Sequence, residues 1–178
     1  MKTFFTLFPT SIGHCGIAWG ERGIVGVWLP ETDESRTRAR LLRRRPDALE
    51  SAPPPGVRAA IEKIVALLSG ERRDLGDVEL DLEAVPAFHR RVYAVARMIP
   101  PGRTLSYGEV ASKLGEPRRA REVGQALARN PFPIVVPCHR VLAAHGRSGG
   151  FSAPGGVSTK LRLHEIEGAR SPAIPTLF

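Results

Sequence analysis

The most telling stretch of this chain runs from Ile134 to Leu142 and reads IVVPCHRVL. It places a cysteine and a histidine side by side between two apolar, β-branched runs, and Pro137 interrupts the run just before the cysteine. A buried cysteine on its own usually behaves as a small hydrophobic side chain. A neighbouring base and neighbouring cations instead convert a thiol into a nucleophilic thiolate. The stretch therefore predicts covalent chemistry at Cys138.

Length and composition are those of a globular intracellular protein. The 178 residues, 42% of them hydrophobic, are enough to build one medium domain or two small ones. Two cysteines are too few for a disulfide framework, which favours a reducing compartment. The N-terminus lacks the pattern of a signal peptide, and no apolar run approaches the roughly 20 residues needed to cross a bilayer. We expect a cytoplasmic protein with no membrane partner.

The positive charge lies in one half of the chain. Residues 1–85 carry 12 basic and 13 acidic side chains, whereas residues 86–178 carry 14 basic and 5 acidic ones, an excess of +9. A half-molecule of this charge favours a polyanion as partner, and nucleic acid is the commonest one. An arginine-rich composition is the alternative explanation, since only four of the 26 basic residues are lysine. It explains the arginine content but not the one-sided placement.

The hydrophobic pattern of the first half indicates a small antiparallel sheet with helices. Strands are expected at Phe4–Phe8, Gly16–Trp19 and Gly23–Leu29, helices at Thr32–Arg45 and Val57–Leu68, and a loop at Ser51–Gly56. A boundary near residue 84 then divides the chain into domains 1–84 and 85–178. The predicted class is α+β, with a small N-terminal sheet-plus-helix domain followed by a mainly helical domain.

The second half contains the pattern of a helix-turn-helix. Ser106 and Glu109 form a capping box, which starts a helix at Tyr107 that ends at Gly115. A second helix is expected from Pro117 to Arg129, with a basic outer face. A solvated helix surface would look similar, but together with the +9 half-chain the motif favours contact with DNA.

A metal site at Cys138 and His139 is the competing interpretation of the central motif. Adjacent residues rarely ligate one ion, no second pair stands at ligand spacing, and the similar pair His14 and Cys15 is far away in the sequence. We therefore predict no metal and no cofactor.

Residues 86–178 resemble the active-site domain of the alkylguanine-DNA alkyltransferases, also called methylated-DNA–protein-cysteine methyltransferases. The signature is Pro137-Cys138-His139-Arg140-Val141, and the first half resembles the family's N-terminal domain only loosely. Supporting motifs follow in the family's order, namely Ser106-Tyr107, Arg121-x-Val123-Gly124, Asn130-Pro131, Gly155-Gly156 and Glu167-Gly168.

The resemblance implies DNA repair by a methyltransferase that acts once. Cys138 would attack the alkyl carbon on guanine O6 and keep the group, His139 would deprotonate the thiol through a water, and Glu167 would orient that imidazole. Glu167 also lies four residues after Leu163, a spacing that turns it toward the interior of a helical packing. Tyr107 would donate to the purine ring. The implied catalytic set is Cys138, His139, Glu167, Tyr107 and Asn130, and the implied alkylguanine pocket is Tyr107, Val141, Phe151 and Ser152.

The resemblance also implies how DNA is bound. The partner would be double-stranded DNA containing alkylated guanine, contacted by a monomer through the minor groove, with Arg121 filling the place of the rotated base. Close approach would need the small Ala120 and Gly124. The remaining contacts would come from Arg118, Arg119, Gln125 and Arg129. Two features depart from the family pattern: Glu122 beside phosphates, which would need Arg118 or Arg119 as a partner, and a longer pocket loop at residues 151–156.

Two other functions fit parts of the sequence. One is a non-catalytic sensor of alkyl lesions, against which the presence of Cys138 argues. The other is a Cys-His hydrolase of a small substrate, in which the basic helix is only a surface. A turnover assay separates them, because an alkyltransferase is consumed stoichiometrically.

Overall fold

The computed structural model describes residues 1–143 and 149–168, and the chain forms two compact units. The first comprises Met1–Ala84 together with Pro131–Val135, and the second comprises Val85–Asn130 and the chain from Val136 onward. The class is α+β, as predicted. The segment Pro131–Val135 belongs with the first unit although it lies well beyond residue 84, and Val27 of the first unit donates its backbone N–H to Pro131 O at 2.9 Å.

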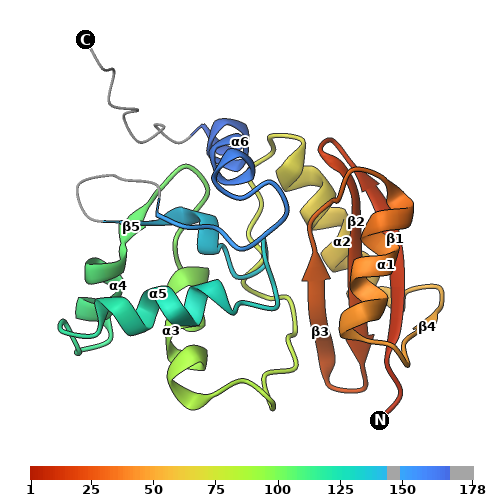
Figure 1. The fold of residues 1–178 in the computed structure, drawn as a ribbon, viewed down its shortest axis with the longest axis horizontal. Helices are drawn as coiled ribbons and strands as arrows, with labels where there is room; N and C mark the ends of the chain where they lie inside the picture. The colour runs from red at the N-terminus through yellow and green to blue at the C-terminus, as the bar shows by residue number, and fades with distance from the viewer. Residues whose placement is uncertain (144–148, 169–178) are drawn as a thin grey trace. The chain divides into compact units, whose positions relative to one another are not determined.

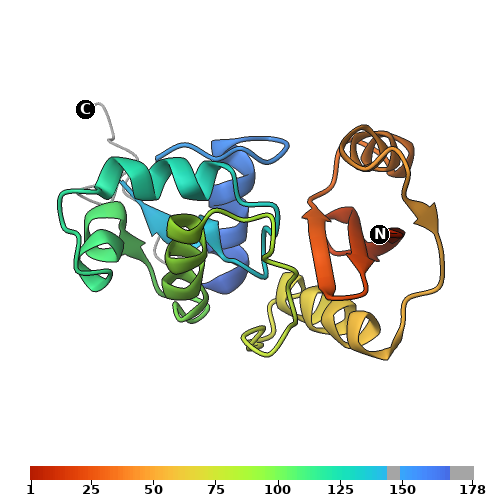
Figure 2. The ribbon, with the colours of Figure 1, turned by 90° about the horizontal axis from the view of Figure 1, so that it is seen from below.

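The first unit is a four-stranded sheet between two helices. The strands β1 (Phe4–Thr10), β2 (Gly13–Gly20) and β3 (Gly23–Trp28) form an antiparallel meander, and the short β4 (Leu49–Glu50) pairs parallel to β1. Helices α1 (Glu34–Arg44) and α2 (Pro55–Leu68) lie on opposite sides of the sheet (Figure 2). The predicted antiparallel sheet is therefore right for three strands, but β4 makes it a mixed sheet.

The start of α2 differs from the prediction, as do the start of α1 at Glu34 and the start of β2 at Gly13. The proline-rich stretch Ser51–Gly56 was expected to be loop throughout, but α2 already begins at Pro55. Proline is well tolerated in the first helical turn, because the N–H that it lacks has no partner within the helix there and its fixed φ suits the helix. The helix therefore starts two residues earlier than its apolar pattern predicts.

Helices dominate the second unit. They are α3 (Ala87–Arg97), α4 (Tyr107–Lys113), α5 (Ala120–Ala128) and α6 (Val157–Glu167), with a 3-10 turn η1 at Cys138–Arg140. Figure 1 shows α3, α4 and α5 gathered together, with α6 near η1. The buried Tyr93 of α3 donates its hydroxyl to Ala126 O of α5 at 2.7 Å, which ties these two helices together.

The predicted helix-turn-helix is present, with one corrected boundary. Ser106 caps α4, its Oγ accepts from Glu109 N at 3.0 Å, and the Glu109 carboxylate accepts from Ser106 N at 2.9 Å. The second helix, α5, begins at Ala120 and not at Pro117. Residues 117 and 118 form a turn, which Arg119 closes by donating its backbone N–H to Glu116 O at 2.9 Å.

A two-residue strand pair joins the 3-10 turn to the start of α4. Strand β5 (Leu105–Ser106) pairs parallel with β6 (Val141–Leu142), so that Leu105 lies opposite Val141. Since Tyr107 follows β5 directly and Cys138–Arg140 precede β6 directly, this pairing brings two distant parts of the sequence to one place. None of the helices in the described ranges is long and apolar enough to cross a membrane.

Candidate active site

The half-buried Cys138 begins the 3-10 turn η1. Its backbone N–H donates to Val136 O at 2.8 Å, and the N–H of Arg140 donates to Pro137 O at 2.9 Å. The apolar run before it is not a strand. Ile134 has φ 74°, a left-handed conformation that is rare for a β-branched residue and costs about 1–3 kcal/mol. The chain is therefore bent sharply just before the cysteine.

His139 and Glu167 form a buried pair. The ring Nε2 of His139 lies 2.7 Å from Glu167 Oε1, and the two side chains are 0% and 3% exposed. Glu167 is the last residue of α6 and points inward, as its spacing from Leu163 predicts. Because an ionised carboxylate only accepts hydrogen bonds, Nε2 carries the proton and Nδ1 keeps the lone pair. That Nδ1 is buried and has no hydrogen-bond partner among the described residues.

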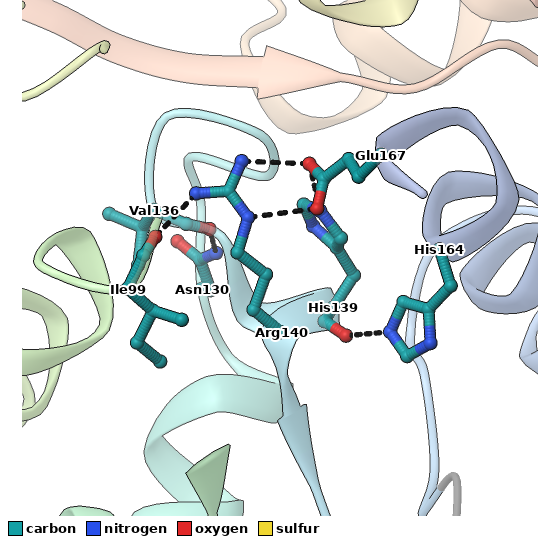
Figure 3. Close-up of polar contacts among 7 residues, drawn as sticks. All are labelled: Ile99, Asn130, Val136, His139, Arg140, His164 and Glu167. Carbon is teal, nitrogen blue, oxygen red and sulfur yellow. Dashed lines mark hydrogen bonds and ion pairs between the residues drawn. The ribbon is translucent and has the colours of Figure 1, made fainter. Parts of the chain in front are cut away.

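Arg140 binds the same carboxylate. Its Nε and Nη2 donate to Glu167 at 3.0 and 2.7 Å, and its Nη1 donates to the backbone oxygen of Ile99 at 2.6 Å (Figure 3). The motif led us to expect a cation that activates the thiol, but the guanidinium is engaged by a carboxylate instead. A planar guanidinium matches two carboxylate oxygens at once, which explains this preference.

The pKa shifts follow from burial and these contacts. Burial alone would raise the pKa of Glu167, but hydrogen bonds from His139 and Arg140 outweigh it and lower that pKa to about 2. Burial lowers the pKa of His139 against the opposing effect of Glu167. Burial also raises the pKa of the Cys138 thiol, although Asn130 and Lys160 oppose the rise. Both directions favour a neutral thiol and a neutral imidazole in the resting pair, so the thiol has to lose its proton when it reacts, as the resemblance implies.

Asn130 supports the turn from the end of α5. Its side-chain Nδ2 donates to Val136 O at 2.9 Å, and its side chain also forms a hydrogen bond with the Cys138 thiol. The amide therefore bridges the residue two positions before the cysteine and the cysteine itself. This contact fixes the thiol relative to the helix that precedes it in the chain.

Tyr107 lies between two glycines. A Cβ added to Gly149 would come within 2.7 Å of the Tyr107 hydroxyl, and one added to Gly124 would lie 3.9 Å from its ring. Gly124, predicted to approach DNA, thus also faces Tyr107. Burial is the main cause that raises the pKa of Tyr107, so its hydroxyl stays protonated. The other predicted pocket residues differ in exposure, with Val141 buried, Phe151 half-buried and Ser152 exposed.

The residues predicted to bind DNA lie on α5, in the turn before it and, for Arg129, at its C-cap. Arg121, Gln125, Arg118 and Arg129 are exposed, while Ala120 is half-buried. Arg119 differs, because its guanidinium stacks 3.7 Å from the centre of the Phe88 ring and pairs with Glu116 at 3.2 Å. The suggested pairing of Glu122 with Arg119 is therefore not favoured, since Glu116 already occupies that arginine.

Comparisons with known proteins agree with this geometry. Residues 87–169 match a family profile described as 6-O-methylguanine DNA methyltransferase, DNA binding domain. The methylated-DNA–protein-cysteine methyltransferase of Mycobacterium tuberculosis is 41% identical over 145 residues, covering 80% of this chain and 86% of the relative. A crystal structure of Mycobacterium tuberculosis OGT in complex with DNA has a TM-score of 0.73 at 34% identity, with 95% of each chain covered.

The chain belongs to the methylated-DNA–protein-cysteine methyltransferase family. It is a DNA-repair enzyme that transfers an alkyl group to a cysteine. A further relative, from Thermus thermophilus, is 42% identical over 90% of this chain and 97% of its own length and is named a DNA base-flipping protein.

Two buried polar residues of this methyltransferase were missed in the sequence. Lys160 and His164 of α6 are both 0% exposed. Lys160 Nζ donates to Val141 O at 2.9 Å and lies at 3.4 Å from Gly150 O, and burial lowers its pKa to about 8. His164 Nε2 donates to the backbone oxygen of His139. The only available signal was their spacing from Glu167, seven and three residues earlier on the same helix.

The second thiol of this methyltransferase is in a different environment. Cys15 is fully buried in β2, and burial raises its pKa to about 12, against a weak hydrogen bond from Thr10. Among residues 1–143 and 149–168, no group of three or more His, Cys, Asp or Glu side chains is arranged to hold a metal ion.

Proposed function

We propose that this methyltransferase repairs double-stranded DNA by moving the alkyl group of O6-alkylguanine to Sγ of Cys138, once per protein molecule. It acts in the cytoplasm as a monomer. The observation that carries the proposal is the position of Cys138, directly before an imidazole whose outer nitrogen is bound by a buried carboxylate at 2.7 Å. This is the arrangement of a nucleophile, its base and a residue that orients the base.

The proposed transfer step uses Cys138, His139, Glu167 and Tyr107. The bond from Sγ to the alkyl carbon forms as the bond from that carbon to O6 breaks, and the thiol proton passes to Nδ1 of His139, through a water where needed. Glu167 accepts from the resulting imidazolium at Nε2 and stabilises it. Guanine leaves as an anion, and the protonated hydroxyl of Tyr107 donates a hydrogen bond to the purine ring. Asn130 holds the thiol, and Val141, Phe151 and Ser152 line the pocket.

Binding to DNA is assigned to residues 85–178, which also carry the transfer site. The target carbon lies inside the duplex, so the nucleotide must rotate out of the base stack before the thiol can reach it. In this proposal α5 enters the minor groove, with Ala120 and Gly124 permitting close approach. Arg121 fills the place of the rotated guanine. The exposed Arg118, Gln125 and Arg129 contact the backbone, and Arg119 contributes from its position beside Glu116.

The direct test is the mass of the intact protein after incubation with duplex DNA containing O6-methylguanine. We expect a gain of one methyl group, located on Cys138 and abolished in Cys138→Ser, because one imidazole does not activate a hydroxyl as it does a thiol. Binding of the lesion without any mass gain would instead favour a sensor, in keeping with the name of the Thermus thermophilus relative. Repeated turnover would favour a hydrolase, and labelling of Cys15 would contradict the assignment of the nucleophile.

A further inference from the structure

Three buried polar side chains form one stripe along α6. Lys160, His164 and Glu167 follow one another at intervals of four and three residues, so they share a face of the helix. All three contact the short stretch from His139 to Val141: Lys160 at the Val141 oxygen, His164 at the His139 oxygen and Glu167 at the His139 ring. One helix face thus binds the main chain and the side chain of the same histidine.

The hydrogen bond of His164 is directional. A backbone carbonyl can only accept, so Nε2 of His164 carries the proton, and its Nδ1 keeps a lone pair. This Nδ1 is buried without a hydrogen-bond partner among the described residues. Leaving a buried polar atom unpaired is unfavourable, and an apolar side chain at this position would avoid it. An apolar residue at position 164 could not donate the hydrogen bond to the His139 carbonyl, and this bond is what the imidazole contributes.

The two contacts on His139 restrict different motions. Glu167 binds only Nε2 of the His139 ring. The ring could still rotate about this nitrogen if the backbone of His139 moved. His164 fixes the carbonyl of the same residue, and Figure 3 shows it approaching His139 from α6 together with Glu167. With both ends fixed, the direction of the remaining nitrogen, Nδ1, is set as well. A displacement of about 1 Å at a reacting group can slow a reaction about 100-fold.

We propose that His164 is a positioning residue for the transfer step, holding the main chain of His139 so that its Nδ1 is aimed to receive the thiol proton. The inference rests on the proposed function of Cys138 and His139. It concerns how the base is held, and not which substrate is bound.

The experiment compares His164→Leu with His164→Gln, and with Glu165→Ala as a control at an exposed site on the same helix. Two rates are measured: methyl transfer from duplex DNA, and alkylation of Cys138 by iodoacetamide as a function of pH. We expect the leucine variant to lose about tenfold or more in both rates and its iodoacetamide profile to move toward higher pH. DNA affinity should not change. The glutamine variant should recover most of the rate, because its amide can reach the carbonyl.

A second pair keeps the test decisive if the leucine variant does not fold. His164→Asn is polar like His164→Gln, but its amide is too short to reach the carbonyl, so it should be about tenfold slower than the glutamine variant. Equal rates for the two amides, or an unchanged pH profile in a folded leucine variant, would overturn the proposal. If the wild-type protein transferred no methyl group at all, the proposed function would fail, while the iodoacetamide profiles would still decide the role of His164.

Discussion

Two helices of the second unit differ in the exposure of polar and charged side chains: those of α6 that face the active-site turn are buried, and those of α5 assigned to DNA contact are exposed. On α6, the side chains of Lys160, His164 and Glu167 are buried, and each has a partner in the stretch from His139 to Val141 that follows the cysteine. On α5 and at its C-cap, Arg121, Gln125 and Arg129 are exposed and make no ion pair within the described residues. Buried charges must be satisfied inside the protein, whereas exposed ones remain available to a partner. The difference separates residues expected to affect the chemistry from residues expected to affect DNA binding.

The sharpest test of this division is Glu167→Gln. We expect methyl transfer to slow by about 100-fold or more, because the imidazole loses the carboxylate that orients it and stabilises its charged form. Affinity for DNA should barely change. Single-turnover kinetics and a binding titration measure the two effects, with Glu165→Gln as the matched exposed control on the same helix. An equal loss of rate and affinity would mean that Glu167 only holds α6 in place.

The carboxylate of Glu167 should make the free energy of unfolding depend on pH in the acidic range. Its pKa of about 2 in the folded protein lies below the ordinary 4.5, so the folded state binds fewer protons than the unfolded state between these values. The stabilisation is complete above pH 4.5 and is lost as the pH falls toward 2, with a size of at most roughly 3 kcal/mol. Denaturant unfolding of the wild type and of Glu167→Gln at several pH values should converge as the pH drops. A constant difference down to pH 2 would contradict the assignment.

On the exposed helix, Arg121→Ala should separate base extrusion from phosphate attraction. Rotation of a base out of the duplex costs a few kcal/mol of stacking and pairing free energy. A side chain that fills the gap offsets part of this cost, so its removal makes the rotated state less stable. We expect repair of duplex DNA to slow by about tenfold, with much less effect on reaction with O6-methylguanine as a free base. Arg118→Ala is the control for simple loss of charge. Equal slowing on both substrates would show that Arg121 supports the pocket.

The smallest expected effects are those on DNA binding when Arg118, Arg119 or Arg129 is replaced by alanine. Removing Arg118 or Arg129 should weaken binding to all DNA sequences and reduce the salt slope by about 1. Arg119→Ala should change the slope less, since its guanidinium is engaged by Glu116 and Phe88. It should lower the thermal midpoint more than the other two substitutions. Identical salt slopes for all three variants would show that Arg119 leaves its partners when DNA binds.

The sequence predicted features that depend on a local pattern. The capping box at Ser106 and Glu109 is specific to a helix start, and the four-residue spacing from Leu163 turns Glu167 inward, where the structure has it. The family and the α+β class were also predicted correctly. These signals involve residues close together in the chain, so little tertiary information is needed to interpret them.

Features that depend on distant contacts were not predictable. Strands β5 and β6 have two residues each, too few to show the alternation of a strand, yet they bring Tyr107 beside the active-site turn. A lysine and a histidine on a helix usually indicate a solvated face, and only the tertiary fold shows Lys160 and His164 to be buried. The stacking of Arg119 on Phe88, 31 residues earlier in the chain, is likewise a contact that the sequence does not show.

The contrast between the two cysteines has a practical consequence for anyone who purifies this protein. Cys15 is sealed inside the sheet and Cys138 is half-exposed, so a thiol reagent should consume one equivalent from the native protein and two after denaturation. A sample that has already reacted with damaged DNA should consume no equivalent of the reagent in the native state and one equivalent after denaturation. The ratio of these two titrations reports the unspent fraction of any preparation, and the second thiol serves as its internal standard.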